Sequence, residues 1–574
     1  MRKLRFCEYK FRSTLFSGTL TKAVSYVLLL CDSIIAGYFI GENGVAAINT
    51  IAPVTAGVIF FSNIISIGTG ILYSRRIGAM QKKEADEIFG QGVILSVLIA
   101  AGGVLILCLC RNAYFDAAGI TGEVYELAAA YYRWTPLSVV FEVLIAYLMQ
   151  MVYIDGDELC NNISNAAMIV GNLVFSILLV GKYGMEGIIL GTIIGNAIGV
   201  LPGFWHFFRK NNTLHFAFHF SFSELLQTVR YSLVDSVIFL CWAVADYVMI
   251  GHVSVRYGEV GLVALAIAFN LIEFGVVLDG VGSAIQPLIG TYFGEDNTLM
   301  IRRLMKDAFT AALLEGLIVS ALAFIFAGQF CMLFGITGGP ALSLSVRTVR
   351  IMAPGLTFCS ILSLVTSYYM LIDHVTLSVV ITALNNGVFY SFLPIAGSIM
   401  YGMNGMWAAF TLSPLLTLFI AAVIVWCLYG KLRFPLLLKD NDSEIYVMDD
   451  ILTKENISRM SENVSDLLLK RDYPKKTALK AALFTEEICL TILEKNSTRK
   501  NTLFAEMTLF FDKSSVLLIE RDSGMLFDLT DPDLKLDGIS GFILSGLMEA
   551  HGEKAYLTTT GYNRNMIRFR KEAL

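Results

Sequence analysis

Seven acidic residues stand in otherwise apolar stretches of this 574-residue chain, and they are the side chains best suited to chemistry. A carboxyl group in hydrocarbon is costly, so it normally faces a cavity or a partner. There it can take up a proton or a sodium ion, or it can fix neighbouring helices through hydrogen bonds. The seven candidates are Asp32, Glu142, Asp235, Asp246, Glu273, Asp279 and Glu315.

Two of these acids stand at corresponding places in the two halves of the chain. DSIIAG at 32–37 aligns with DYVMIG at 246–251, so each half has one deep carboxylate. Asp235 precedes Asp246 by eleven residues, and at ~100° per residue the two return to nearly the same helix face. This stripe, together with Glu273, could line a polar path in the second half. The alternative for each acid is a structural role between helices, and Asp32 is the first candidate for ion binding.

The elements that position these acids are repeated along the chain. Residues 134–155 recur in outline as residues 352–373, and YGMEG at 183–187 recurs as YGMNG at 401–405. Parallel repeats in a membrane protein usually bracket a central transport path between two halves. The positions that match at the same spacing are Pro136 with Pro354, Ile154 with Ile372, and Asp155 with Asp373.

Composition indicates a polytopic membrane protein with a soluble tail. The chain is 56% hydrophobic and 16% charged, and its mean hydropathy is +0.65. Close to half of its Asp, Glu, Lys and Arg residues follow residue 434. We therefore expect an N-terminal six-helix lobe at 1–210, a second six-helix lobe at 211–435 and a soluble domain at 436–574.

Twelve apolar stretches predict twelve membrane spans, since each is near or above the ~20 residues that cross a bilayer. The basic segments between them fall on one side, which the positive-inside rule assigns to the cytoplasm, together with both termini and the tail. The ten cysteines show no CxxC pair or regular spacing, so neither a zinc site nor a disulfide framework is indicated. The expected spans are 18–40, 45–73, 88–110, 124–153, 160–181, 185–208, 224–251, 260–292, 304–334, 341–372, 374–400 and 403–430.

Three segments resemble signatures of the multidrug and toxic compound extrusion (MATE) transporters. They are DSIIAGYFIGENGVAAINTIAPV at 32–54, GTGILYSRRIGAMQKKEADEIFGQGV at 68–93 and GSAIQPLIGTYFGE at 282–295. The resemblance runs from about residue 10 to residue 430. It implies twelve helices in two pseudo-symmetric lobes, a substrate cavity between them, and alternating access driven by inward proton or sodium flow.

The resemblance also implies a coupling site in the N-terminal lobe. Asp32 falls on the family's first-helix aspartate, Asn172 on its fifth-helix asparagine, and Thr192 resembles its sixth-helix threonine. The family's usual acid four residues after that asparagine is absent, because Ser176 stands there. A site with two carboxylates becomes a site with one, which leaves the identity of the coupling ion open.

The tail alternates helical and strand-like stretches, a pattern typical of an α/β sandwich. It resembles the ATP-binding domain shared by histidine kinases and anti-sigma-factor serine kinases. The resemblance implies that Asp522 accepts a hydrogen bond from adenine, that Gly524 and Gly541 allow close backbone approach, and that Glu486 or Glu487 orients water. The magnesium-binding asparagine of that family is replaced by Thr491. Binding of ATP and magnesium without strong hydrolysis is therefore an alternative to kinase activity.

Three hypotheses follow for the function of the chain. The first is a secondary antiporter of the cell membrane that exports a small amphipathic or cationic compound, with the tail as a regulatory domain open to a cytoplasmic regulatory protein. The second is a lipid-linked saccharide flippase, which would require basic residues in the cavity to meet phosphates. The third is a signalling ATPase or serine kinase that uses the bundle as a receptor. The acidic character of the spans favours the first; apart from the lipid bilayer no other macromolecular partner is indicated, and nucleic acid is not expected.

Overall fold

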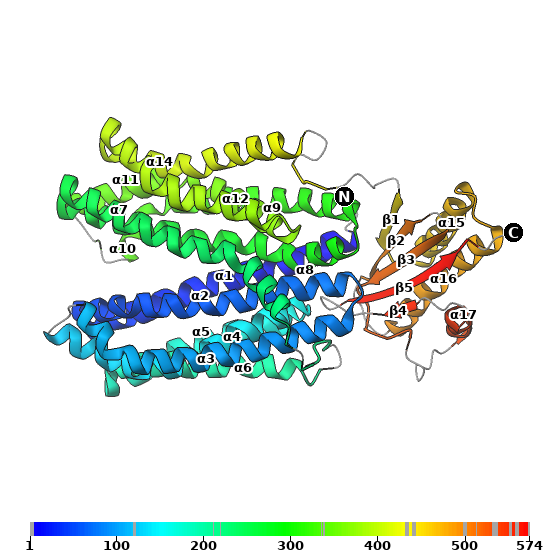
Figure 1. The fold of residues 1–574 in the computed structure, drawn as a ribbon, viewed down its shortest axis with the longest axis horizontal. Coiled ribbons are helices and arrows are strands. Elements are labelled where there is room, and N and C mark those ends of the chain that lie inside the picture. Colours follow the sequence, from blue (N-terminus) through cyan, green and yellow to red (C-terminus); the bar gives the residue numbers. More distant parts are fainter. Residues whose placement is uncertain are drawn as a thin grey trace.

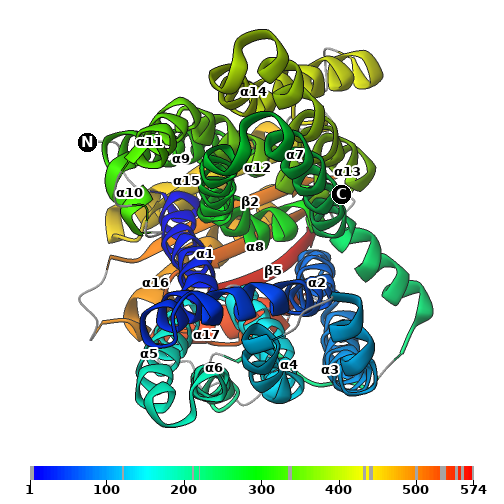
Figure 2. The same ribbon diagram turned by 90° about the vertical axis from the view of Figure 1, so that its left-hand side faces the viewer.

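The computed structural model describes residues 5–118, 122–209, 212–218, 220–333, 336, 339–430, 435–438, 444–497, 502–512, 514–530, 538–549, 554–556 and 562–571. Two helical lobes lie one above the other, and a mixed α/β tail lies against one end of both (Figure 1). A view from the opposite end shows the strands of the tail crossing behind the two lobes (Figure 2).

The N-terminal lobe consists of six long helices, as the repeat predicts. Gly184 makes the turn between α5 and α6, with φ +56°. The helices are α1 Phe6–Phe39, α2 Glu42–Gly78, α3 Lys82–Ala118, α4 Gly122–Ile154, α5 Glu158–Tyr183 and α6 Met185–His206.

The C-terminal lobe contains the same bundle with more interruptions. Its α-helices are α7 Phe222–Phe274, α8 Gly280–Gly294, α9 Thr298–Ile325, α10 Ala327–Leu333, α11 Gly339–Met352, α12 Gly355–Leu371, α13 Val375–Thr382 and α14 Tyr390–Tyr429. A 3₁₀ segment, Gly275–Asp279, precedes α8, and a π-helical segment, Ala383–Phe389, precedes α14.

The expectation of twelve spans is confirmed only in part. Among the described residues, eight helical stretches are long and apolar enough to cross a membrane, or nine if the pair Leu342–Met352 and Gly355–Leu371, bent by 47°, counts as one. One expected boundary, between residues 251 and 260, is absent as a helix break. Helix α7 continues past residue 251 because it contains no proline to interrupt its hydrogen bonds.

The boundary expected between spans 374–400 and 403–430 is present as a turn inside α14. Tyr401 and Gly402 leave the helical conformation there, and Gly402 has φ +65°. Gly184, its repeat mate in YGMEG, has φ +56° between α5 and α6. Only glycine adopts such angles readily, so the two YGM motifs perform the same reversal in the two lobes.

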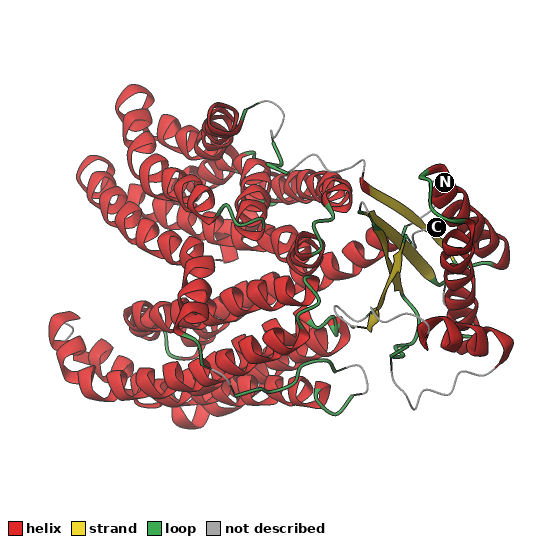
Figure 3. Cartoon of the chain, turned by 45° about the vertical axis from the view of Figure 1, so that its right-hand side comes forward, coloured by secondary structure: helices red, strands yellow, loops and turns green. Residues whose placement is uncertain are grey.

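The tail is a five-stranded antiparallel sheet with helices on one face. The strand order is β1-β2-β3-β5-β4, and a hydrophobic core that includes Phe484, Ile488 and Leu518 lies between sheet and helices. Figure 3 shows these helices on the side of the sheet that faces away from the lobes. The strands are β1 Ile445–Ile451, β2 Phe504–Phe511, β3 Ser515–Asp522, β4 Lys554–Tyr556 and β5 Asn563–Arg570; the helices are α15 Lys454–Lys470, α16 Lys475–Lys495 and α17 Gly538–Glu549.

Candidate functional site

Asp32 lies at the centre of a buried polar cluster in the N-terminal lobe. Its side chain belongs to α1 and is 8% exposed. Thr192 Oγ1 on α6 lies 3.1 Å from Oδ1 and 3.0 Å from Oδ2 of the carboxylate, and Asn172 Nδ2 on α5 lies 3.4 Å from Oδ1. Asn172 also donates to Thr192 Oγ1 at 2.7 Å. The three residues predicted from the sequence are thus in mutual contact, and their role in ion coupling remains a prediction.

Tyr131 on α4 completes the cluster, and sequence reasoning missed it. Its hydroxyl donates to Asp32 Oδ2 at 2.8 Å. Tyr131 stands in the run AAAYYRW beside Tyr132, whose hydroxyl instead donates to the Leu107 carbonyl. Nothing in the local sequence distinguishes the two tyrosines, because the packing of α4 against α2 and α6 directs one of them to Asp32.

Small residues allow α5 and α6 to approach closely enough to bring Asn172 and Thr192 together. A Cβ on Gly191 would lie 2.2 Å from Ser176 Oγ, and one on Gly195 would lie 2.5 Å from Asn172 N. Ser176 is fully buried and donates to the Ile188 carbonyl at 3.1 Å. A carboxylate in place of Ser176 would not fit at this spacing without moving the helices. The cluster is therefore built around a single acid.

The cluster offers oxygen ligands and no described positive charge. Every hydrogen bond described to Asp32 comes from a neutral hydroxyl or amide. Asn172 Oδ1 is buried and has no hydrogen-bond donor among the described residues. Carboxylate, amide and hydroxyl oxygens are the ligands that hard cations prefer. The site can hold either a proton on Asp32 or a small cation between these oxygens.

The other predicted acids lie elsewhere. The side chains of Asp235 and Asp246 are outside the described part of the structure. Glu273 is at the end of α7, and Glu315 accepts a hydrogen bond from Thr19 at 3.3 Å. Among the described contacts, none joins Glu273 or Glu315 to Asp32.

Asp279 and Glu142 are the two remaining acids predicted within the spans. Asp279 accepts a hydrogen bond from Ser363 at 2.6 Å within the C-terminal lobe. Glu142 is half-buried on α4, and no hydrogen bond is described between it and Asp32. Asp279 therefore lies apart from the Asp32 cluster, whereas Glu142 is near enough to Tyr131 to interact with it electrostatically.

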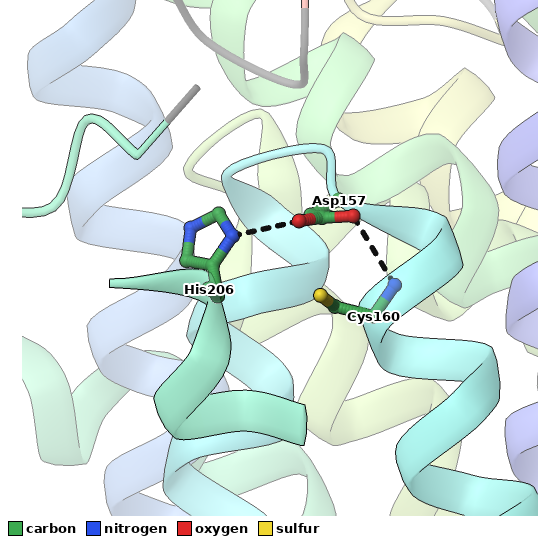
Figure 4. A group of neighbouring side chains, drawn as sticks. All are labelled: Asp157, Cys160 and His206. Atoms are coloured by element: carbon green, nitrogen blue, oxygen red, sulfur yellow. Dashed lines mark hydrogen bonds and ion pairs between the residues drawn. The ribbon is translucent and has the colours of Figure 1, made fainter. Parts of the chain in front are cut away.

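A second polar cluster lies at the tail-side end of the N-terminal lobe and combines Asp157, Cys160 and His206 (Figure 4). Their ligand atoms lie within 4.8 Å of one another, which is the spacing of a metal site. Both ring nitrogens of His206 already face carboxylates, Asp157 at 2.9 Å and Asp155 at 2.8 Å, and Arg209 donates to both Asp157 oxygens. A cation would have to displace the guanidinium, so the cluster fits an ion-pair network that ties α6 to the α4–α5 turn.

The tail residues predicted to bind nucleotide occupy three elements. Asp522 ends β3, and its Oδ1 accepts from Gly524 N at 2.6 Å and from Asn563 Nδ2 at 3.1 Å. Asn496, which the sequence reasoning did not single out, accepts from Met525 N at 3.0 Å and so holds the same loop to the end of α16. Burial raises the pKa of Asp522 to about 7.

The remaining tail candidates lie on helices. Glu487 is buried on α16 with Oε2 lacking a donor among the described residues, whereas Glu486 accepts from Ser461 at 3.2 Å. Thr491 donates to the Glu487 carbonyl at 2.8 Å. Gly541 is buried on α17, and no described hydrogen bond joins it to Asp522.

A family model described as MatE matches residues 19–178 and 232–395, which is more than half of the chain. The chain belongs to the MATE family. The curated protein "Multidrug export protein MepA" of Staphylococcus haemolyticus (strain JCSC1435) is 23% identical over 294 residues, a match that covers 49% of this chain and 64% of that protein. The chain thus spans less than two thirds of the length of this relative.

Solved structures share the fold of the MATE lobes. A structure of "MATE in the bent conformation" is 21% identical with a TM-score of 0.67, covering 75% of this chain and 96% of that chain. An "outward-facing conformation of a multidrug resistance MATE family transporter of the MOP superfamily" is 20% identical with a TM-score of 0.68, again covering 75% and 96%. A MOP superfamily transporter from Pyrococcus furiosus Vc1 is 20% identical with a TM-score of 0.68, covering 76% and 97%. The MATE family match ends at residue 395, so the tail lies outside it.

Proposed function

We propose that this MATE family member is a secondary active antiporter that exports small amphipathic or cationic compounds, driven by inward flow of protons or sodium ions through the site at Asp32. The observation that carries the proposal is a buried carboxylate whose hydrogen-bond donors, among the described residues, are all neutral and come from three other helices. The family membership and the name of the relative, a multidrug export protein, support the same class of activity.

The hydrogen bonds of Asp32 link its charge state to helix position. The ionised carboxylate only accepts, and Tyr131, Thr192 and Asn172 all donate to it. Protonation turns one carboxylate oxygen into a donor and removes the negative charge, so the hydrogen bonds from these three donors become weaker. Because the partners belong to α4, α5 and α6, proton binding changes the packing of α1 against its own lobe. That change is the step that would favour one of two lobe arrangements over the other.

A sodium ion would act on the same residues in a different way. It would take oxygen ligands from Asp32, from Thr192 and from Asn172 Oδ1, which has no donor among the described residues. The side-chain amide of Asn172 would then turn its oxygen rather than its nitrogen toward the acid. Both ions are compatible with one carboxylate, and the transport assay below separates them.

The test is efflux from proteoliposomes that contain the full chain and an encapsulated cationic dye. We expect the wild-type protein to export dye under an imposed proton or sodium gradient, and we expect Asp32→Asn to abolish export while the protein still inserts. Glu315→Gln is the matched control, since Glu315 is another acid within the spans and no described contact joins it to Asp32. Equal export by wild type and Asp32→Asn would overturn the coupling role. Dependence on one gradient alone identifies the ion.

We propose in addition that the tail binds a nucleotide and regulates transport. The observation in favour is a group of buried carboxyl groups on β3 and α16, in which Glu520 and Asp522 face each other and Glu487 Oε2 has no donor among the described residues. Buried acceptors of this kind are costly unless a ligand or water supplies donors. The amino group of adenine is such a donor. Calorimetry of the full chain with ATP and magnesium is the test; we expect binding that Asp522→Asn weakens, and no heat from the wild type would reduce the tail to a protein-binding module.

A further inference from the structure

The tail presents one row of charged residues to the lobes. In the register of the sheet, Asp449 of β1 lies opposite Glu506 of β2, and Glu506 lies opposite Arg521 of β3. Arg521 in turn lies opposite Arg564 of β5. Residues directly opposite one another on neighbouring strands point to the same face of a sheet. All four therefore project from the face opposite to the helices of the tail. Glu506, Arg521 and Arg564 are fully buried, so the lobes cover this face.

Arg564 binds the end of a helix from the N-terminal lobe. Its two terminal nitrogens donate to the carbonyls of Ile77 at 2.7 Å and Gly78 at 2.8 Å, the last residues of α2. Carbonyls at the end of a helix have no partner within the helix and carry its negative dipole. A guanidinium group satisfies both requirements at once. The same side chain lies 2.6 Å from Glu295 Oε1, so it bridges two lobes.

The C-terminal lobe provides the acidic partner. Glu295 follows the last residue of α8 and pairs with both Arg521 and Arg564. One turn earlier, Tyr292 donates to Glu506 at 3.1 Å, and Glu506 pairs with Arg521 at 2.6 Å. The two arginines thus face Glu295 and Glu506, and none of these four side chains is more than 1% exposed.

The first turn of α1 makes a third attachment to the same face. Phe6 N donates to Asp449 Oδ1 at 2.8 Å, and its ring packs edge-on against Tyr562 at 5.1 Å. Tyr9 stacks on Phe504 at 4.9 Å. The sheet is therefore attached to α1 and α2 of one lobe and to α8 of the other.

The helices that the sheet holds are also in direct contact with each other. A Cβ on Gly78 of α2 would lie 2.6 Å from the Thr291 carbonyl and 2.9 Å from Gly294 Cα of α8. Such an approach leaves no passage between these two helix ends. Separating the lobes at this end would pull Glu295 away from Arg564, or Arg564 away from the α2 carbonyls. Either movement leaves a buried charge without its partner, which is strongly unfavourable.

We propose that the tail is an interlobe clamp, which keeps the transporter closed at its tail-side end until the sheet is released. This inference rests on the proposed alternating access of the lobes, and it assigns the tail a mechanical role in addition to ligand binding. Substrate on the tail side of the membrane cannot enter while α2 and α8 are held together. Release of the Arg564–Glu295 bridge is the event that permits opening.

The experiment measures the distance between the two lobes in the full chain. Spin labels on unnatural amino acids at Lys83 of α3 and Lys306 of α9 report the tail-side separation, since both side chains are exposed. We expect one short distance in the wild type in lipid nanodiscs. In Arg564→Ala we expect a second, longer population. Arg570→Ala, an exposed arginine at the far end of β5, is the matched control and should leave the distribution unchanged.

Glu295→Gln is a second variant, which distinguishes loss of the bridge from misfolding of the tail in Arg564→Ala. This residue belongs to the lobes, so its substitution breaks the bridge without touching the sheet, and it should produce the same longer population as Arg564→Ala. Unchanged distances in both variants, with both proteins folded by circular dichroism, would overturn the clamp. Dye efflux is measured on the same samples. Longer distances without wild-type efflux refute the antiporter alone, whereas normal wild-type efflux with unchanged variant distances refutes the clamp alone.

Discussion

Two buried carboxylates of this protein, Asp32 and Glu295, have opposite surroundings. Asp32 is held by two hydroxyls and one amide, all of them neutral. Glu295 is held by the guanidinium groups of Arg521 and Arg564. Both acids are almost inaccessible to solvent.

These surroundings decide which of the two acids can bind and release a cation. An acid paired with two arginines already has a permanent positive partner, because arginine stays protonated in proteins. An acid surrounded by neutral donors has no such partner, so a proton or a small cation can supply the missing charge. We infer a mobile charge at Asp32 and a fixed bridge at Glu295.

The largest effect is expected at the site with the exchangeable charge. Asp32→Asn keeps the size of the side chain and removes its ability to ionise. We expect a loss of gradient-driven efflux of at least ~100-fold, which corresponds to about 2.7 kcal/mol or more at ~1.4 kcal/mol per tenfold change. Initial rates in proteoliposomes measure it, with membrane insertion checked by protease protection. Residual efflux above about a tenth of the wild-type rate would contradict the contrast.

Removal of Arg564, a permanently charged partner of Glu295, should lower the stability of the tail more than it lowers the rate of efflux. Arg564→Ala leaves Glu295 and Glu506 with Arg521 alone, and breaking a buried pair costs about 3–5 kcal/mol. We expect a lower melting temperature for the tail of the full chain in detergent, followed by scanning calorimetry. The control Arg570→Ala should melt like the wild type. A melting temperature equal to that of the control would mean that the bridge does not hold the tail.

A smaller change is expected when one neutral donor of Asp32 is removed. Tyr131→Phe deletes a hydrogen bond to a charged group, a contribution of about 1.5–3 kcal/mol. We expect efflux to slow by about tenfold and to remain measurable, since Thr192 and Asn172 still donate. Tyr132→Phe is the matched control because its hydroxyl binds the Leu107 carbonyl instead. Equal rates for the two variants would show that Tyr131 does not act on the acid.

The smallest effect concerns the acid on the far face of the tail sheet. Burial raises the pKa of Asp522 to about 7, so its carboxyl group gains its full accepting capacity only as the pH rises through that value. We expect the affinity of the full chain for ATP to rise severalfold between about pH 6 and pH 8, and to be independent of pH in Asp522→Asn. The raised pKa also means that the stability of the fold falls as the pH rises from about 4, the ordinary pKa of an aspartate, through about 7. Affinity that falls with pH in the wild type would contradict an accepting role.

Sequence reasoning could find the members of the Asp32 cluster that stand in recognisable motifs. Asp32, Asn172 and Thr192 each lie in such a segment, and the structure places them in contact. It could not find Tyr131, which resembles its neighbour Tyr132 in every local respect. It also could not find the bridge at Glu295, because Arg521 and Arg564 read as ordinary polar positions of strands. Residues 226 and 269 positions apart from Glu295 meet it only through the docking of a whole domain.

In the repeated YGM motifs, the local sequence was sufficient to predict where a helix ends. Gly184 and Gly402 adopt positive φ angles in equivalent YGM motifs, and that preference belongs to glycine itself. The continuous α7 is a case in which the sequence did not predict the structure: a boundary was expected between residues 251 and 260, but this segment contains no proline and the helix continues through it.

The sequence by itself determined the apolar stretches that form membrane-spanning helices, the repeated design of the two lobes, the acids within them and the α/β pattern of the tail. These properties depend on composition and on periodicity along the chain, which are local. The tertiary structure alone decided which charges are compensated, because compensation depends on contacts between residues far apart in sequence. Asp32 and Glu295 are both acids in the sequence, and only packing places hydroxyls around one and arginines around the other.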